Sequence, residues 1–268
     1  MTTPVNSVAD RRSAFSPAVP LIGREVRRLA RHPVFWAIPF IVAAAAAGDS
    51  ASAGRTAGYW YGTVLTAVTF FGPIFVLFAA NLVASNARRS RVEELLSVTP
   101  TSDTRRTWAL CLGVALPLAG AGAICVGAMA LIDRLNDIPP DQLLTAGELA
   151  QLPFIPVGAG LLGVLGARWL AFPGGALITL VVATLAALNV FRRFAAGIWW
   201  MWWTTGTPLE GQVPVPGDPW LHAAYLAGLC ACASIAAVYR DRTQWTRLVL
   251  VGAPVLAVTL AIGWLQLP

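Results

Sequence analysis

Long runs of apolar residues alternate with short charged connections along the whole chain. Within these runs, stretches of about 18 to 25 residues carry no charged side chain, which is the length that a helix needs to cross about 30 Å of hydrocarbon. The runs are continuous and lack the two-residue alternation of a membrane β-barrel. The pattern therefore predicts an all-α polytopic membrane bundle, with seven spans at residues 34–48, 58–84, 107–132, 150–167, 172–190, 220–239 and 247–266.

The count of spans has one open alternative. The first predicted span, 34–48, is short and contains Pro39, so its ends are poorly defined by the pattern. A proline inside an apolar run interrupts the helical hydrogen-bond ladder. Six membrane helices are therefore the alternative to seven.

Charge is distributed unevenly over the connections. Residues 1–32 hold six arginines and two acidic residues, 85–106 hold five and three, and 240–247 hold three and one. Arg168 lies in another connection of the same alternating set, whereas the intervening connection 133–149 holds four acidic residues and one arginine. Arginine excess on every second loop marks the cytoplasmic side of a membrane protein. We expect a multi-pass protein of the bacterial plasma membrane with a cytoplasmic N-terminus.

The N-terminal region divides into a polar leader and an amphipathic segment. Residues 1–20 lack the apolar stretch of a cleavable signal peptide and form the predicted cytoplasmic leader. In 21–33, the helical period places two sets on opposite faces: Ile22, Val26, Leu29 and Pro33 on one, and Arg24, Arg27, Arg28 and Arg31 on the other. Such a helix suits the membrane interface, with arginines toward lipid headgroups, and Pro33 is predicted to end it. An ordinary juxtamembrane anchor is the alternative interpretation.

A second amphipathic segment, about 88–99, lies in the charged connection between the second and third spans. The helical period places Val92, Leu95, Leu96 and Thr99 on one face and Glu93, Glu94 and Ser97 on another. Pro100 ends this helix, and Thr101, Ser102 or Asp103 caps the next one. An apolar face beside exposed carboxylates suits docking into a groove of a cytoplasmic partner. A solvated face that balances nearby arginines is the simpler alternative.

Composition excludes several functions. All 19 basic residues are arginine, so the chain has no P-loop lysine and no Schiff-base lysine. The arginines are spread over juxtamembrane connections, which favours lipid headgroups over nucleic acid. The sequence Gly158–Gly163, GAGLLG, has no preceding strand and lies in an apolar run, so it predicts close helix packing through Ala159, Gly163 and Ala167 and not a nucleotide site.

Polar and sulfur-containing residues inside the predicted spans have modest interpretations. Asn81 and Asn189 line a pathway or make helix-to-helix hydrogen bonds, and the sequence leaves both alternatives open. The four cysteines are predicted to be small apolar core residues without a metal pattern: Cys111, Cys125, Cys230 and Cys232. No metal or catalytic site is predicted.

Two motifs together resemble a known family. Glu25–Trp36 reads E-x-R-R-x-x-R-x-P-x-F-W, and Arg91–Ser102 reads R-x-E-E-L-L-S-V-T-P-T-S after two spans. This order is similar to that of permease (transmembrane) subunits of ATP-binding-cassette (ABC) transporters of the type-two exporter class. The resemblance covers the first half of the chain by motif and the second half by hydropathy.

The resemblance implies a function and a set of residues. Residues 21–33 would be the elbow helix, with Glu25, Arg28 and Arg31 near the ATPase, and 34–268 the permease domain. The coupling helix would contact the ATPase subunit through Val92, Glu93, Glu94, Leu95, Leu96, Thr99 and Pro100. The chain would be no enzyme itself, because ATP and Mg would bind to the partner subunit. A second permease copy or a homologous permease would complete the substrate pathway.

The predicted external loop 191–219 also acquires a second interpretation from the resemblance. Its tryptophans Trp199, Trp200, Trp202 and Trp203 suit an aromatic belt at the membrane interface. In the family, this segment dips back into the membrane and forms an external gate. Arg192 and Arg193 depart from the charge pattern, since they fall on the predicted outer side.

One departure from the family and two competing functions leave alternatives. The family core has six spans with both ends in the cytoplasm, whereas residues 247–266 read as a seventh, either an accessory helix or part of a larger design. A non-transport membrane anchor or sensor that docks a cytoplasmic partner is the competing function. A secondary transporter ranks third, because ionisable residues within the spans are few.

Overall fold

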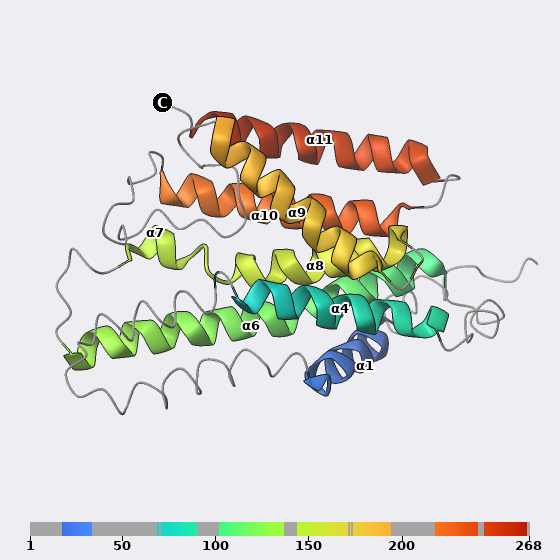
Figure 1. Ribbon diagram of the computed structural model, residues 1–268, viewed down its shortest axis with the longest axis horizontal. Coiled ribbons are helices and arrows are strands. Elements are labelled where there is room, and N and C mark those ends of the chain that lie inside the picture. Colours follow the sequence, from blue (N-terminus) through green and yellow to red (C-terminus); the bar gives the residue numbers. More distant parts are fainter. Residues whose placement is uncertain are drawn as a thin grey trace, which may run out of the picture.

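The computed structural model describes residues 18–33, 69, 71–89, 102–136, 144–170, 172, 174–193, 218–240 and 244–266. These residues form helices and no strand (Figure 1). The helices are α1 (Ala18–Ala30), α4 (Gly72–Arg89), α6 (Asp103–Asn136), α7 (Ala146–Leu149), α8 (Phe154–Trp169), α9 (Gly175–Arg193), α10 (Pro219–Val238) and α11 (Trp245–Trp264). The all-α prediction is therefore confirmed for the described part of the chain.

Four described helical segments are long and apolar enough to cross a membrane: Asp103–Leu135, Ala146–Trp169, Pro219–Val238 and Trp245–Trp264. Gly72–Asn86 and Gly175–Leu185 are shorter apolar helices. The protein thus has the helices of a membrane protein. The first predicted span, 34–48, and the start of the second lie outside the described residues, so the count of six or seven stays a prediction.

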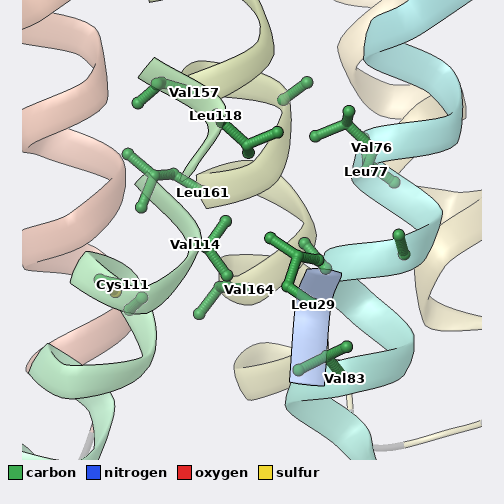
Figure 2. Packing of buried hydrophobic residues seen from close by; sticks show 14 of the residues in the cluster. Leu29, Val76, Leu77, Val83, Cys111, Val114, Leu118, Val157, Leu161 and Val164 are labelled. Carbon is green, nitrogen blue, oxygen red and sulfur yellow. The ribbon is translucent and has the colours of Figure 1, made fainter. Parts of the chain in front are cut away.

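Helix α8 occupies the middle of the bundle and packs against α4, α6, α9 and α10 (Figure 1). Its Val157, Leu161 and Val164 belong to the same buried cluster as residues of α4 and α6 (Figure 2). Glycine allows this close approach, since a Cβ added at Gly160 would lie 2.6 Å from Leu118 Cδ1. Helices in lipid associate mainly through such close packing of small residues.

The packing interpretation of the GAGLLG sequence is confirmed. Gly163 lies directly against the backbone carbonyl of Leu77 on α4, and a Cβ there would be 3.1 Å from Ala80 Cβ. Ala159 and Ala167 are 5% and 4% exposed, so all three predicted small positions face inward. The glycines serve contact between helices and leave no space for a ligand at Gly163.

Local capping residues determine where several helices begin. The Ser102 side chain accepts the backbone N–H of Arg105 at 3.3 Å, which selects Ser102 among the three predicted caps of α6. Asp218 accepts the N–H groups of Trp220 and Leu221 before α10, and Pro219 takes the first helical position. Thr145 and Glu148 form a capping box at α7.

Helix α11, the predicted seventh span, is integrated in the bundle through α10. A Cβ at Gly228 of α10 would lie 2.9 Å from Thr259 Cγ2, so the two helices are in direct contact. Its outer face keeps Trp245 and Trp264 exposed at 53% and 71%. These tryptophans stand 19 positions apart, about 28 Å along a helix, which matches the hydrocarbon thickness between two aromatic belts.

Candidate functional site: the arginine-rich end of the bundle

Helix α1 lies across α6 and also touches α4 (Figure 1). A Cβ added at Gly113 of α6 would be 2.7 Å from Glu25 Cβ, so the two helices meet without an intervening side chain. Leu29 is fully buried in the core cluster beside α4 and α8 residues (Figure 2). The face of α1 that carries Leu29 is therefore packed against the helix bundle.

The bounds of this helix differ from the predicted 21–33. The structure begins it at Ala18 and ends it at Ala30. Pro33 is exposed and lies just beyond the helix, as expected of the residue that ends it. The physical reason is that the residues before a proline avoid helical geometry, which ends the helix before Pro33 can share its periodicity.

The charged side of α1 divides into a paired and an exposed part. Arg28 Nη1 donates to both carboxylate oxygens of Glu25, at 3.0 and 3.1 Å. Such a partly buried i,i+3 pair stabilises a helix by about 0.3–0.5 kcal/mol. Arg24, Arg27 and Arg31 are exposed. Of the predicted elbow residues, Glu25 and Arg28 thus hold each other, and Arg31 belongs to an exposed basic surface.

Four helices are joined by polar side chains at one end of the bundle, in a polar junction made of Asp103, Thr104, Arg168, Arg240 and Gln244. Arg168, in the last turn of α8, makes an ion pair with Asp103, the first residue of α6. Arg240, just after α10, donates to the backbone carbonyl of Arg168. Gln244, before α11, donates to Thr104 Oγ1 at 3.2 Å.

Trp169 makes a further hydrogen bond between helices at this end. Trp169 Nε1 donates to the backbone carbonyl of Ala236 at 3.0 Å, which links the end of α8 to the last turn of α10. The Trp169 side chain is 47% exposed. A ring with one polar contact and an apolar exposed body suits a membrane interface.

The opposite end of the bundle holds a second polar group that sequence reasoning missed. We call Thr145, Glu148, Gln151, His222 and Gln266 the distal polar cluster. The four residues other than Thr145 are at most 5% exposed. Glu148 accepts from Thr145 N at 2.6 Å, and Gln151 Nε2 donates to the carbonyl of Pro219 at 3.1 Å. The first bond closes the capping box of α7, and the second links the turn after α7 to the start of α10.

His222 connects α10 to the end of α11 within this cluster. Its Nδ1 is 3.0 Å from Gln266 Oε1, and Gln266 Nε2 donates to the carbonyl of Ile262. Because the amide nitrogen is used in that bond, Nδ1 of His222 is the donor to Oε1. The Thr145-x-x-Glu148 spacing is a capping-box signal that sequence reading could have found, whereas nothing local marks the contact of His222 with Gln266.

For Asn81, the sequence left open whether the side chain lines a pathway or bonds to another helix. Its Nδ2 donates to the backbone carbonyl of Gly163 at 3.1 Å, and the side chain is 4% exposed. Asn81 therefore makes a helix-to-helix hydrogen bond between α4 and α8. The side chain of Asn189 lies outside the described residues.

The coupling residues Val92, Glu93, Glu94, Leu95, Leu96, Thr99 and Pro100 lie outside the described residues, and so do Trp199, Trp200, Trp202 and Trp203. The described chain stops at Arg89, the end of α4, and resumes at Ser102, one residue before α6. In the sequence, only residues 100–102 separate the predicted coupling helix from Asp103 of the polar junction.

The described residues contain no group of three His, Cys, Asp or Glu side chains that could hold a metal ion. The four cysteines are unbonded to one another, and Cys111 and Cys230 belong to the buried hydrophobic cluster. These two behave as small core residues.

Comparison of the chain with protein-family models, with curated proteins and with solved structures finds no match.

Proposed function

We propose that this chain is the transmembrane permease subunit of an ATP-driven ABC exporter. The observation that carries the proposal is the charged helix pattern with its proline at Arg91–Ser102, whose last residue directly precedes the first residue of α6. A partner that docks on this segment acts directly on the first turn of a helix long enough to span the membrane. The packing of α1 against α6 supports the proposal, because it places the predicted elbow helix against α6, the same helix that follows the predicted coupling segment.

The arginine-rich end of the bundle faces the cytoplasm in this proposal. The exposed side chains of Arg24 and Arg27 on α1, and of Arg31 directly after it, contact anionic lipid headgroups of the plasma membrane. The polar junction lies at the same boundary, and the distal polar cluster lies toward the outside. The chain crosses the membrane six or seven times from a cytoplasmic N-terminus.

The chain works as a pair, either with a second copy or with a homologous permease. A separate ATPase subunit binds ATP and Mg and docks on the coupling residues of each permease. Closure of the ATPase pair shifts the helices between inward-open and outward-open states, which is a population shift and not a chemical step in this chain.

Co-purification tests the proposed docking. We expect the full chain, co-expressed with ABC ATPase subunits from the same source, to retain one of them and to change its rate of ATP hydrolysis. A variant with Glu93→Ala, Glu94→Ala, Leu95→Ala and Leu96→Ala should lower retention by about 10-fold or more, since interface contacts of this kind contribute about 1–2 kcal/mol each. The measurements are the ATPase to permease ratio and the hydrolysis rate.

The matched control changes a leucine and a carboxylate near the C-terminal end of α6, far from the predicted coupling segment. Leu131→Ala with Asp133→Asn should keep retention at the wild-type level, because Leu131 is 56% exposed and far along the helix from Asp103. Undiminished retention by the coupling variant would refute the docking assignment. Retention of a cytoplasmic partner without any ATPase would instead favour the membrane anchor or sensor.

A further inference from the structure

An ion pair at the start of α6 holds a mostly buried arginine. Asp103 is 66% exposed in its side chain, whereas Arg168 is only 14% exposed. In the described part of the chain, Nε of Arg168 has no hydrogen-bond partner. The mostly buried guanidinium therefore depends on Asp103 for its charge partner. Placing a cation in this position is costly unless it is paired.

The ion pair joins two helices with different roles. Asp103 begins the helix that follows the predicted coupling segment, and Arg168 ends the helix at the centre of the bundle. The backbone carbonyl of the same Arg168 accepts from Arg240. A movement of Asp103 therefore acts on α8 through the side chain of Arg168. It acts on Arg240, just after α10, through the backbone carbonyl of Arg168.

The packing of α8 determines what such a movement does next. Gly160 and Gly163 hold α8 in direct contact with α6 and α4, and Gly166 holds it against Thr179 of α9. Close-packed helices have little free volume, so they move as rigid pieces and do not absorb a displacement by deformation. The end of α8 is thus a point where a local shift reaches several helices.

We propose that Asp103 and Arg168 are positioning residues that transmit movement of the coupling segment to the central helix α8. The inference rests on the proposed function, and it adds a route through residues that the family resemblance does not supply. In this role the ion pair is unnecessary for docking of the ATPase. It is required for the ATP-dependent rearrangement of the helices at the far end of α8.

The test uses the complete permease–ATPase complex in lipid nanodiscs. Val157 on α8 is 8% exposed at rest and lies near the far end of that helix, so a Val157→Cys thiol reports separation of the helices there. The four native cysteines are replaced by alanine. The measurement is the rate of maleimide labelling with and without ATP, Mg²⁺ and orthovanadate, alongside the retained ATPase and its hydrolysis rate.

We expect ATP to raise the labelling rate of the reporter by about 5-fold or more in the wild-type background, which corresponds to a coupling free energy of ordinary allosteric size. Asp103→Asn and Arg168→Gln should each abolish most of this increase while the ATPase remains bound. The exchanged pair, Asp103→Arg with Arg168→Asp, should restore it in large part. A merely structural role would lower the melting temperature without separating ATPase binding from the labelling response.

The controls are Asp133→Asn and Arg134→Gln, which remove charges from the other end of α6 and should leave the response unchanged. A normal response in both single variants, or an exchanged pair no better than the singles, would overturn the inference. If Arg168→Gln gives no monodisperse protein, Asp103→Asn decides alone, since it alters a largely exposed side chain. Failure of the wild-type chain to retain an ATPase refutes the proposed function separately, before any variant is compared.

Discussion

Single glycines determine how closely the central helices approach. Gly163 of α8 meets the carbonyl of Leu77, and its own carbonyl accepts the hydrogen bond from Asn81. The α4–α8 contact therefore combines close packing with one buried polar bond. In lipid, where helix association has no hydrophobic driving force between helices, both terms count.

Gly163→Ala should destabilise the protein, because the added Cβ would overlap the Leu77 carbonyl and force α4 and α8 apart. Overpacking of this kind costs about 1–3 kcal/mol. The apparent melting temperature in detergent, followed by loss of the monodisperse peak in size-exclusion chromatography, should fall. Gly127→Ala is the matched control, since nothing lies within 4 Å of that position, and it should keep the wild-type value. Equal melting temperatures for the two variants would contradict this account of the contact.

At the scale of an element, helix ends depend on capping and not on hydropathy. The third predicted span, 107–132, lies within a helix that runs from Asp103 to Asn136, because polar residues at both ends continue the helix. The fourth, 150–167, begins in the turn Gln151–Pro153 that separates α7 from α8, so its helix starts only at Phe154. Hydropathy detects the apolar centre of such helices, whereas caps and turns decide where they stop.

The exposed basic surface of α1 leads to a prediction about lipid. Replacing Arg24, Arg27 and Arg31 by glutamine should lower the amount of co-purified anionic phospholipid, because each arginine near an anionic surface contributes about 1 kcal/mol. Native mass spectrometry of the protein in mild detergent would measure the ratio of phosphatidylglycerol to phosphatidylethanolamine retained. The ratio should be unchanged in the control Arg134→Gln. An unchanged ratio in the triple variant would argue against an interfacial α1.

At the scale of the whole molecule, the two ends of the bundle have different chemistry. One end has the polar junction, with α1 packed nearby on the first third of α6 at Gly113, and the other has the distal polar cluster with Glu148 and His222. Helices α6 and α11 both begin at the junction, where Thr104 and Gln244 are bonded, and both run away from it. Their far ends should therefore lie on the same side of a membrane.

This arrangement predicts a labelling pattern in intact cells. In a background without native cysteines, Leu135→Cys and Leu265→Cys should react with a membrane-impermeant maleimide, whereas Arg105→Cys should react only after the cells are permeabilised. All three positions are exposed in the structure, so reactivity reports the side of the membrane. Reaction of Arg105→Cys in intact cells would reverse the predicted orientation.

The sequence alone determined the helical class, the approximate position of most apolar helices and the charge difference between connections, because these are local properties that follow from composition and period. It also suggested the small-residue packing of α8. Tertiary structure decided which groups meet: Asp103 with Arg168, His222 with Gln266, and Asn81 with the carbonyl of Gly163. These partners lie 44 to 82 positions apart in the chain. Their pairing depends on the angle and depth at which whole helices pack, and no local pattern encodes that geometry.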